Sequence, residues 1–374
     1  MKASPRWDGN AFNVHPALPD LRTGGMPGMG ELLCGPRRVP EAPLPSVDPR
    51  AAWSRRPETG LRATWLGHST ILLEIGGVRI LTDPVWGERA SPLGFAGPKR
   101  FQPVPVPLAA LADVDVVLIS HDHYDHLDYP TIQALVRTPC RSSPASVSAL
   151  TSRRGESRRR GSPSSIGGRA RVPGSDVVVT AAPSQHFSGR SLGARNTTLW
   201  SGFAVRSDRH ALFFSGDTGL TTEYKDIRDR LGPFDLVMLE VGAFHPGWGD
   251  IHLGPERALA AHELLGGGLF LPVHWGTFSL ATHAWDDPAE QLVARAPQLG
   301  VHLAMPRLGE SFEPARVERV DPWWRATAAG ERGDTPAETT AADAQDAAAL
   351  PGPSIDEDWT AQLKRPRVAV AIPM

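Results

Sequence analysis

The sequence has little of what marks secreted, membrane-spanning or nucleic-acid-binding proteins. Its 374 residues include only two cysteines, Cys34 and Cys140, which excludes a disulfide framework and suits a reducing compartment. The N-terminus lacks the apolar core of a secretory signal, and no segment approaches the ~20 apolar residues of a membrane helix. The formal net charge is only −2, so no overall field favours nucleic acid. These absences predict a cytoplasmic protein without a transmembrane segment.

The composition changes along the chain and suggests one folded domain between two irregular ends. Residues 1–60 are rich in Pro and Gly and predict an irregular N-terminal arm. Residues 61–315 carry the apolar periodicity of strands and helices, and with 41% hydrophobic residues the chain can bury a large core. Residues 316–374 turn rich in Ala, Thr, Asp, Glu and Pro, which predicts a mostly disordered tail. Within it, Trp323-Trp324 could fold back onto the domain.

Strand-like and helix-like segments alternate in two halves of this domain. Gly76-Gly77 joins two of the strands as a hairpin. The expected strands are Thr64–Leu66, Thr70–Ile75, Val78–Thr82, Val114–Ile119, Asp176–Ala181, Leu199–Val205, Ala211–Ser215, Phe234–Val241, Leu269–Val273 and Val301–Ala304. The expected helices are Tyr129–Val136, Glu223–Leu231, Pro255–Leu265 and Asp287–Ala296. The pattern predicts an α/β fold, an αββα sandwich of two mixed sheets packed face to face with helices outside.

The main chemical signal follows the buried strand that ends at Ile119. It reads His121-Asp122-His123-Tyr124-Asp125-His126 and combines imidazole and carboxylate groups, which suit zinc or a similar divalent ion. In extended chain, His121 and His123 point the same way and can bind one ion. Asp125 and His126, at the turn into a helix, can face a second. The alternative is a polar loop at a strand end, but so dense a pattern favours a metal site.

These residues and five further short motifs resemble one branch of the metallo-β-lactamase superfamily. That branch contains the N-acyl-phosphatidylethanolamine-hydrolysing phospholipases D and their bacterial relatives. The motifs occur in the same order as in the branch, over roughly residues 65–312, and the resemblance implies the same αββα fold. The motifs are Trp65-Leu66-Gly67-His68-Ser69-Thr70, Thr82-Asp83-Pro84-Val85, Arg89-Ala90-Ser91-Pro92, Gly97-Pro98-Lys99-Arg100-Phe101 and His274-Trp275-Gly276-Thr277-Phe278.

The resemblance also implies a set of ligands for two divalent ions, with zinc the preferred metal. His121, His123 and His186 would bind the first ion; Asp125, His126 and His274 would bind the second; Asp217 would bridge both. A hydroxide held between the ions would attack the substrate, so Asp125 and Asp217 are also expected in catalysis. Taken singly, His186 and His274 could be ordinary core histidines, and Asp217 in Ser-Gly-Asp-Thr-Gly could form a turn.

Other polar residues are candidates for supporting roles. His252 matches a histidine near the active site of the phospholipase branch and is expected to orient substrate or protonate the leaving group; the alternative is an exposed loop histidine. His68 has weaker support. The candidate partners of the ligand histidines are Asp83, Asp128 and Glu240, and the expected bystanders are His210, His262 and His302.

The leading hypothesis is a phospholipase D-like zinc phosphodiesterase acting on an N-acyl phospholipid or a related phosphodiester. Alternatives are a hydrolase of lactones or other acyl compounds and an inactive metal-binding relative. A lipid substrate would bring peripheral contact with a membrane, and Phe95, Phe101 and Trp248 could contact acyl chains. Nucleic-acid binding through residues 153–171 ranks last, because aromatic residues are not interleaved with the arginines. Nothing in the sequence specifies an oligomeric state.

One stretch, residues 141–175, departs from the family pattern. It is rich in Ser, Gly and Pro, contains eight arginines and has almost no apolar periodicity. A basic disordered insertion, a solvated loop and a stretch translated in the wrong reading frame would each account for it, and the abrupt loss and return of family-like sequence favours the last. The segment is expected to lie outside the sheets, because it has too few apolar groups to offset the entropy of ordering. Trypsin should then cut it readily, and the domain should lose stability.

Overall fold

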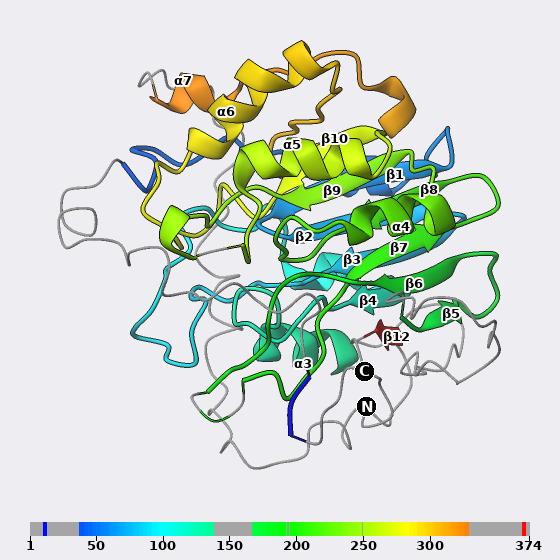
Figure 1. Ribbon diagram of the computed structural model, residues 1–374, viewed down its shortest axis with the longest axis horizontal. Helices are drawn as coiled ribbons and strands as arrows, with labels where there is room; N and C mark the ends of the chain where they lie inside the picture. Colours follow the sequence, from blue (N-terminus) through cyan, green and yellow to red (C-terminus); the bar gives the residue numbers. More distant parts are fainter. Residues whose placement is uncertain are drawn as a thin grey trace.

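The computed structural model describes residues 10–12, 37–137 and 167–328 (except 192, 194 and 249), together with the strand at 369–371. In this part of the chain, two six-stranded sheets face each other and helices cover their outer sides (Figure 1). The αββα sandwich expected from the sequence is confirmed. The disorder expected for 141–166 and for most of the tail concerns residues outside these ranges.

The first sheet has the spatial order β11-β1-β2-β3-β4-β12. Neighbours β1, β2 and β3 are antiparallel, whereas β4 is parallel to β3 and to β12. Gly76 and Gly77, both at positive φ (56° and 75°), form the predicted hairpin turn between β2 and β3. The strands are β1 (Leu61–Gly67), β2 (Thr70–Ile75), β3 (Val78–Thr82), β4 (Val116–Leu118), β11 (Ser311–Phe312) and β12 (Ala369–Ala371).

The second sheet has the order β10-β9-β8-β7-β6-β5. Strands β8, β9 and β10 are parallel, so their carboxyl ends lie together at one edge of the sheet and their amino ends at the other. This polarity later separates two groups of histidines. The strands are β5 (Arg169–Arg171), β6 (Val178–Ala182), β7 (Gly202–Arg206), β8 (Ala211–Phe214), β9 (Leu236–Glu240) and β10 (Leu269–Val273).

The helices cover two separate hydrophobic layers. Leu73 and its neighbours on one face of the first sheet pack toward the second sheet, whereas Leu72 on the opposite face packs with Ile132 of α3. The α-helices are α2 (Arg50–Trp53), α3 (Tyr129–Arg137), α4 (Glu223–Leu231), α5 (Gly254–Leu264), α6 (Asp287–Arg295) and α7 (Trp324–Ala328). The 3₁₀ turns are η1 (Leu108–Leu111), η2 (Pro246–Trp248), η3 (Ala296–Leu299) and η4 (Pro314–Arg316).

Two expectations about single strands were wrong. Val301–Ala304 is not a strand and makes only one bridge, between Leu303 and Phe270 of β10. Phe270 bonds to this segment through both its N–H and its C=O, but the next residue facing it on β10 is Pro272, which has no N–H to extend the ladder. The second error is Arg169–Arg171, at the end of the aberrant segment, which pairs with β6 instead of lying outside the sheets.

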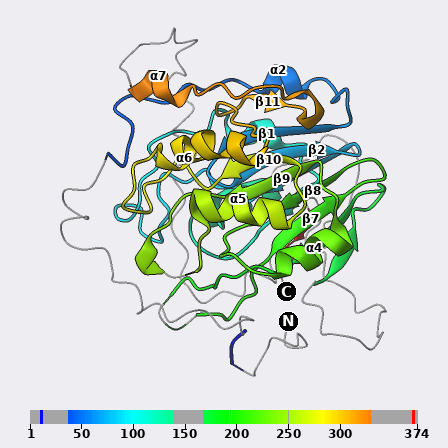
Figure 2. The same ribbon diagram turned by 45° about the horizontal axis from the view of Figure 1, so that its top comes forward.

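The tryptophan pair after the domain does fold back, as expected. Trp323 and Trp324 are buried, and Trp324 donates from Nε1 to Glu290 of α6 at 2.6 Å. Both rings also pack against Trp275. Figures 1 and 2 accordingly show α7 beside α6. The ordered domain therefore extends beyond its expected end at residue 315.

In the part of the chain that the structure describes, no helix combines the length and apolar character needed to cross a membrane.

Candidate metal centre

The seven residues expected to bind metal all follow the carboxyl end of a strand. His121 to His126 follow β4 of the first sheet, and His186, Asp217 and His274 follow β6, β8 and β10 of the second. The structure brings all seven together at one end of the sandwich, in two adjoining clusters of metal-ligating atoms; a third, overlapping group joins Asp217 and His274 to His252. Segments far apart in the sequence thus meet where the two sheets end.

The first cluster consists of His121, His123, His186 and Asp217. His123 Nδ1 lies 2.9 Å from His121 Nε2 and 3.3 Å from His186 Nε2. Asp217 Oδ2 lies 3.8 Å from the Nε2 atoms of both His121 and His186. Ligands held about 2.0–2.1 Å from a tetrahedral zinc are separated by about 3.3 Å, so this spacing matches a shared ion.

The second cluster joins Asp125, His126 and His274, with Asp217 again beside them. Asp125 Oδ2 is 3.4 Å from His126 Nε2 and 3.3 Å from His274 Nε2. Asp217 Oδ1 lies 3.2 Å from His126, and its Oδ2 lies 3.2 Å from His274. The two oxygens of Asp217 therefore face both clusters, as a bridging carboxylate must. His68 also belongs to this cluster.

The hydrogen bonding shows that these residues fit divalent cations. His126 Nε2, His274 Nε2 and Asp217 Oδ1 are buried and make no hydrogen bond to a described residue. Leaving a buried polar atom without a partner costs free energy, so three such atoms converging on one space need a common ligand. Imidazole nitrogens and carboxylate oxygens in this number are typical of zinc and related metals.

The ring nitrogens of His126 and His186 that face away from the clusters are held by partners, whereas His274 Nδ1 makes no hydrogen bond to a described residue. His126 Nδ1 donates to the buried carboxylate of Asp83 at 2.7 Å. Asp83 is itself fixed by the backbone N–H and hydroxyl of Ser120, at 2.7 and 2.6 Å. His186 Nδ1 donates to the carbonyl of Ile251 at 3.0 Å. Such partners orient a ligand histidine and select its tautomer.

Of the three carboxylates predicted as partners, Asp83 and Glu240 contact site histidines and Asp128 does not. Asp128 instead accepts hydrogen bonds from the backbone of Gly87 and the hydroxyl of Thr131, so that prediction was wrong. Asp128 lies in the helix-entry turn after the motif, and its side chain ties the loop after β3 to α3.

Charge in the site is divided between carboxylates and histidines. Burial opposes a charge on His274, but Asp217 and Asp125 outweigh it and raise the pKa of His274 to about 10. Burial likewise opposes ionisation of Asp217, yet His126 and His274 hold its pKa well below the usual range. At His186 burial outweighs the attraction of Asp217 and lowers the pKa of the imidazole well below normal. Bound cations would replace the protons on the ligand histidines.

His252 lies at the edge of the centre. Its Nδ1 donates to Glu240 at 3.2 Å and lies 4.0 Å from Asp217 Oδ2. Burial opposes its protonated form, but Glu240 prevails and raises the pKa of His252. Its ring is 5.1 Å from that of His186, and Trp248 lies 6.1 Å away on the outer side. The exposed-loop alternative does not describe this residue, whose side chain is only 13% exposed.

Comparison with known proteins identifies the family. Residues 78–275, more than half of the chain, match the model of the beta-lactamase superfamily domain. The chain belongs to the beta-lactamase superfamily. A metal-dependent hydrolase of Korarchaeum cryptofilum is 30% identical over 256 residues, 68% of this chain and 99% of that protein. The protein is accordingly a metal-dependent hydrolase of this superfamily.

Two other relatives cover much of the chain. An uncharacterized protein of Mycobacterium tuberculosis is 45% identical over 292 residues, 76% of this chain and 77% of that protein. N-acyl-phosphatidylethanolamine-hydrolyzing phospholipase D 1 of Caenorhabditis elegans is 36% identical over 236 residues, 60% of this chain and 66% of that protein. The resemblance to the phospholipase branch that the motifs indicated is thereby confirmed.

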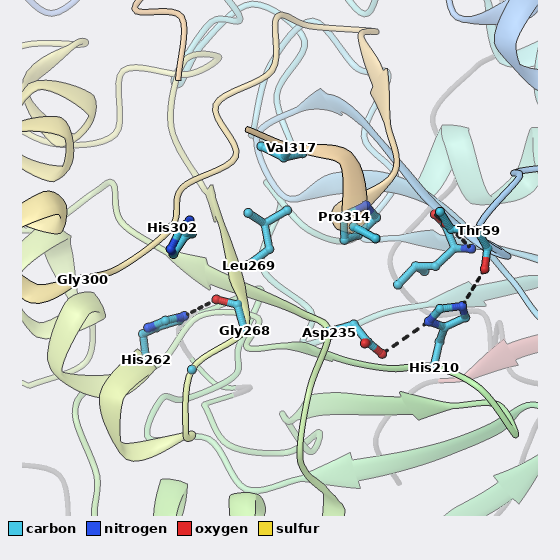
Figure 3. A pocket seen from close by; sticks show the side chains of 13 residues that line it. Thr59, His210, Asp235, His262, Gly268, Leu269, Gly300, His302, Pro314 and Val317 are labelled. Carbon is cyan, nitrogen blue, oxygen red and sulfur yellow. Dashed lines mark hydrogen bonds and ion pairs between the residues drawn. The ribbon is translucent and has the colours of Figure 1, made fainter. Parts of the chain in front are cut away.

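Three other histidines of this superfamily member lie away from the centre, as expected for bystanders. His210, His262 and His302 line a cavity of about 410 Å³ (Figure 3). Asp235 and Leu269, which also line it, lie just before β9 and at the start of β10, so the cavity is at the opposite end of the parallel strands from the metal centre.

Sequence reasoning gave too little weight to His68. The usable signal was its place after an apolar strand in Trp65-Leu66-Gly67-His68, the same strand-end position that the other site residues occupy.

Proposed function

We propose that this hydrolase is a zinc phosphodiesterase that cleaves an N-acyl phospholipid or a related phosphodiester with an apolar chain. The observation that carries the proposal is the complete donor set of two adjoining clusters, with Asp217 facing both and His252 held against them by Glu240. The Caenorhabditis elegans relative, whose name gives N-acyl-phosphatidylethanolamine as its substrate, supports the choice. A complete donor set also favours an active enzyme over an inactive relative.

Each part of the site has a place in phosphodiester hydrolysis. Divalent ions bound by the two clusters would act as Lewis acids on a phosphoryl oxygen and activate water. Glu240 fixes His252 with Nδ1 as the donor, which leaves Nε2 as the free ring nitrogen to exchange a proton with the leaving oxygen. His252 is thus proposed as the general acid, and the buried Asp83 as the group that orients His126.

Two arginines on the loop after β6 support an anionic substrate. The Arg190 guanidinium lies 3.9 Å from the centre of the Tyr124 ring, and that of Arg195 lies 4.8 Å from the centre of the Phe187 ring. Phe187 in turn packs 4.7 Å from the ring of His123, a candidate ligand. No carboxylate of a described residue pairs with either arginine. Their positive charge beside the centre favours a phosphodiester over a neutral lactone.

A small pocket of about 20 Å³ lies beside the centre; it can contact one group of the substrate and is too small to enclose an acyl chain. It adjoins His274, which connects it to the second cluster, and Arg38 and His283 are among its polar residues. Its apolar side chains are Phe101, Trp275, Phe278, Leu280 and Trp285. Phe101 lines this pocket and is proposed to contact the substrate, whereas Phe95 does not line it.

Phe95 instead supports the proposed contact with a membrane surface. Its side chain is 82% exposed and that of Leu93 is 47% exposed, on a loop closed by a bridge between Arg89 and Lys99. The loop is attached beside the centre, because Arg100 at its end pairs with Phe278. Apolar residues exposed at the tip could enter the bilayer interface while the metal centre faces the headgroups.

The substrate proposal is tested with the metal-loaded enzyme on three substrates: N-acyl-phosphatidylethanolamine in vesicles, a water-soluble aryl phosphodiester, and a long-chain lactone. We expect hydrolysis of both phosphodiesters and little of the lactone. Leu280→Asp should lower kcat/KM for the lipid but not for the aryl phosphodiester, because the change places a negative charge in the small pocket beside His274. Preferential hydrolysis of the lactone would reject the phosphodiesterase proposal in favour of an acyl hydrolase.

The membrane and metal parts of the proposal have separate measurements. Phe95→Ser should reduce the fraction of the protein that sediments with anionic phospholipid vesicles. Turnover of the soluble phosphodiester should stay unchanged. Elemental analysis of purified protein should find close to two divalent ions per chain, with zinc predominating; less than one tightly held ion in folded protein would contradict the two-ion centre. The cytoplasmic location remains a prediction from the cysteine count.

A further inference from the structure

The backbone of His68 connects two of the turns that build the metal centre. His68 occupies the turn between β1 and β2 with φ at 51°. Its carbonyl accepts a hydrogen bond from the backbone N–H of His274 at 3.0 Å, and its own N–H donates to the hydroxyl of Thr277 at 2.7 Å. Since both partners belong to the turn after β10, the His68 turn in the first sheet is bonded directly to a ligand-bearing turn of the second.

The side chain of His68 points into the second cluster. The residue is 1% exposed, and its Nε2 lies 3.1 Å from Asp125 Oδ2, within hydrogen-bond distance. The ring is 4.1 Å from the ring of His274 and 5.3 Å from that of His126. Nδ1 makes no hydrogen bond to a described residue, so Nε2 makes the polar contact of this imidazole.

Asp125 lies in a loop, where its side chain can rotate. Its carboxylate therefore needs a hydrogen-bond donor that holds it in the orientation for binding a cation. A carboxylate oxygen has more than one lone pair, so Asp125 Oδ2 can accept from His68 and still face an ion. A fixed donor removes the rotational freedom of the side chain and holds one oxygen toward His126 and His274. Second partners of this kind are usually worth 10–100-fold in metal affinity or activity.

We infer that His68 is a positioning residue for the second ion: its Nε2–H holds Asp125 in the orientation that binds metal. The geometry of the chain supports this role, because His68 hydrogen-bonds both the Asp125 carboxylate and the His274 backbone. The inference rests on the proposed two-ion centre and is independent of the substrate.

The test compares His68→Ala and His68→Gln with the parent and with His302→Gln, an exposed histidine at the far end of the strands. Each apoprotein is titrated with Zn²⁺ by calorimetry and with Co²⁺ by visible absorption. The parent should take up two ions. His68→Ala should keep the first and bind the second roughly 10–100-fold more weakly. His68→Gln should recover part of the loss with an unchanged Co²⁺ spectrum, because its amide can donate near the position of Nε2.

The outcomes separate this inference from the proposed centre. If the parent protein binds fewer than two ions, the two-ion centre fails, whatever the variants do. If the parent binds two and His68→Ala binds both with unchanged affinity, the positioning role is wrong. If His68→Gln binds as weakly as His68→Ala and both change the Co²⁺ spectrum, His68 is itself a ligand, which also overturns the positioning role. Thermal melts of the apoproteins check that each variant is folded.

Discussion

Histidine and aspartate residues lie at both ends of the parallel strands β8, β9 and β10, but their hydrogen bonding differs between the two ends. At the carboxyl ends, histidine and aspartate side chains converge and leave buried atoms without hydrogen bonds. At the amino ends, three histidines and Asp235 line the cavity of Figure 3. There, His262 Nε2 donates to the carbonyl of Gly268 at 2.8 Å, and His210 Nε2 donates to that of Thr59 at 2.9 Å.

The difference shows that histidine number alone does not mark a metal site. His262, whose Nε2 is paired with a backbone carbonyl, has little to gain from a cation. His210 differs, because its Nδ1 is buried without a hydrogen bond to a described residue and lies 3.4 Å from Asp235 Oδ2. At the metal end, Asp83 and a backbone carbonyl accept from Nδ1 of His126 and His186, so Nε2 of each ring is held in place and faces the clusters. Activity should therefore depend on one end of the strands and tolerate changes at the other.

The largest effect is expected from losing a ligand that both clusters use. Asp217→Asn should reduce hydrolysis to the uncatalysed background and lower the bound metal, because the neutral amide cannot bridge two cations. His123→Ala should act similarly through the first cluster. Turnover and metal content are measured together, with His302→Ala as the matched control. Normal activity in Asp217→Asn with normal metal content would contradict the assigned centre.

A smaller effect is expected from the proposed general acid. His252→Ala should reduce kcat by roughly 10²–10⁴-fold, the usual contribution of a positioned acid–base group. Both ions should stay bound, since this histidine is not among the proposed ligands. Steady-state kinetics on the aryl phosphodiester and metal analysis test this, and an unchanged kcat on a good substrate would make His252 a structural residue.

A change in a ligand's partner should have a weaker effect still. Asp83→Asn should cost roughly 10–100-fold in affinity for the second ion, because Asp83 orients His126 and makes it more basic. The control is Asp128→Asn, since Asp128 contacts no candidate ligand and bonds to Gly87 and Thr131. Competition with a zinc chelator measures both variants. Equal losses in the two would show that the contact to His126 is not what matters.

The far end should affect stability but not chemistry. His262→Ala removes a buried imidazole that donates to Gly268 and stacks on Phe270, 5.3 Å between ring centres. We expect a loss of about 1–3 kcal/mol in the free energy of unfolding, because the Gly268 carbonyl is left without its donor. Urea denaturation measures that loss, and kcat should stay within error of the parent. A large drop in kcat would mean that the two ends are coupled.

Much of the fold could be predicted because local patterns agreed with the tertiary result. Apolar runs predicted most of the strands, and the Gly76-Gly77 turn is where the hairpin closes. The errors occurred where pairing depends on a distant partner. Residues 301–304 look like a strand, but Pro272 in the neighbouring strand prevents the ladder. Residues 169–171 have no strand pattern of their own and extend only because the edge of β6 offers hydrogen bonds.

By itself, the sequence determined which residues this protein offers to a metal ion. Histidine and aspartate at strand ends already indicated a metal site, because these residue types are metal ligands, and the family motifs indicated a metal-dependent hydrolase. Only the tertiary structure decided which carboxylate serves which histidine: Asp83 for His126, Glu240 for His252, and Asp128 for none of them. Such pairings join residues 12 to 43 positions apart, and their geometry is set by how neighbouring strands pair and how the loops after them fold back, which no local pattern encodes.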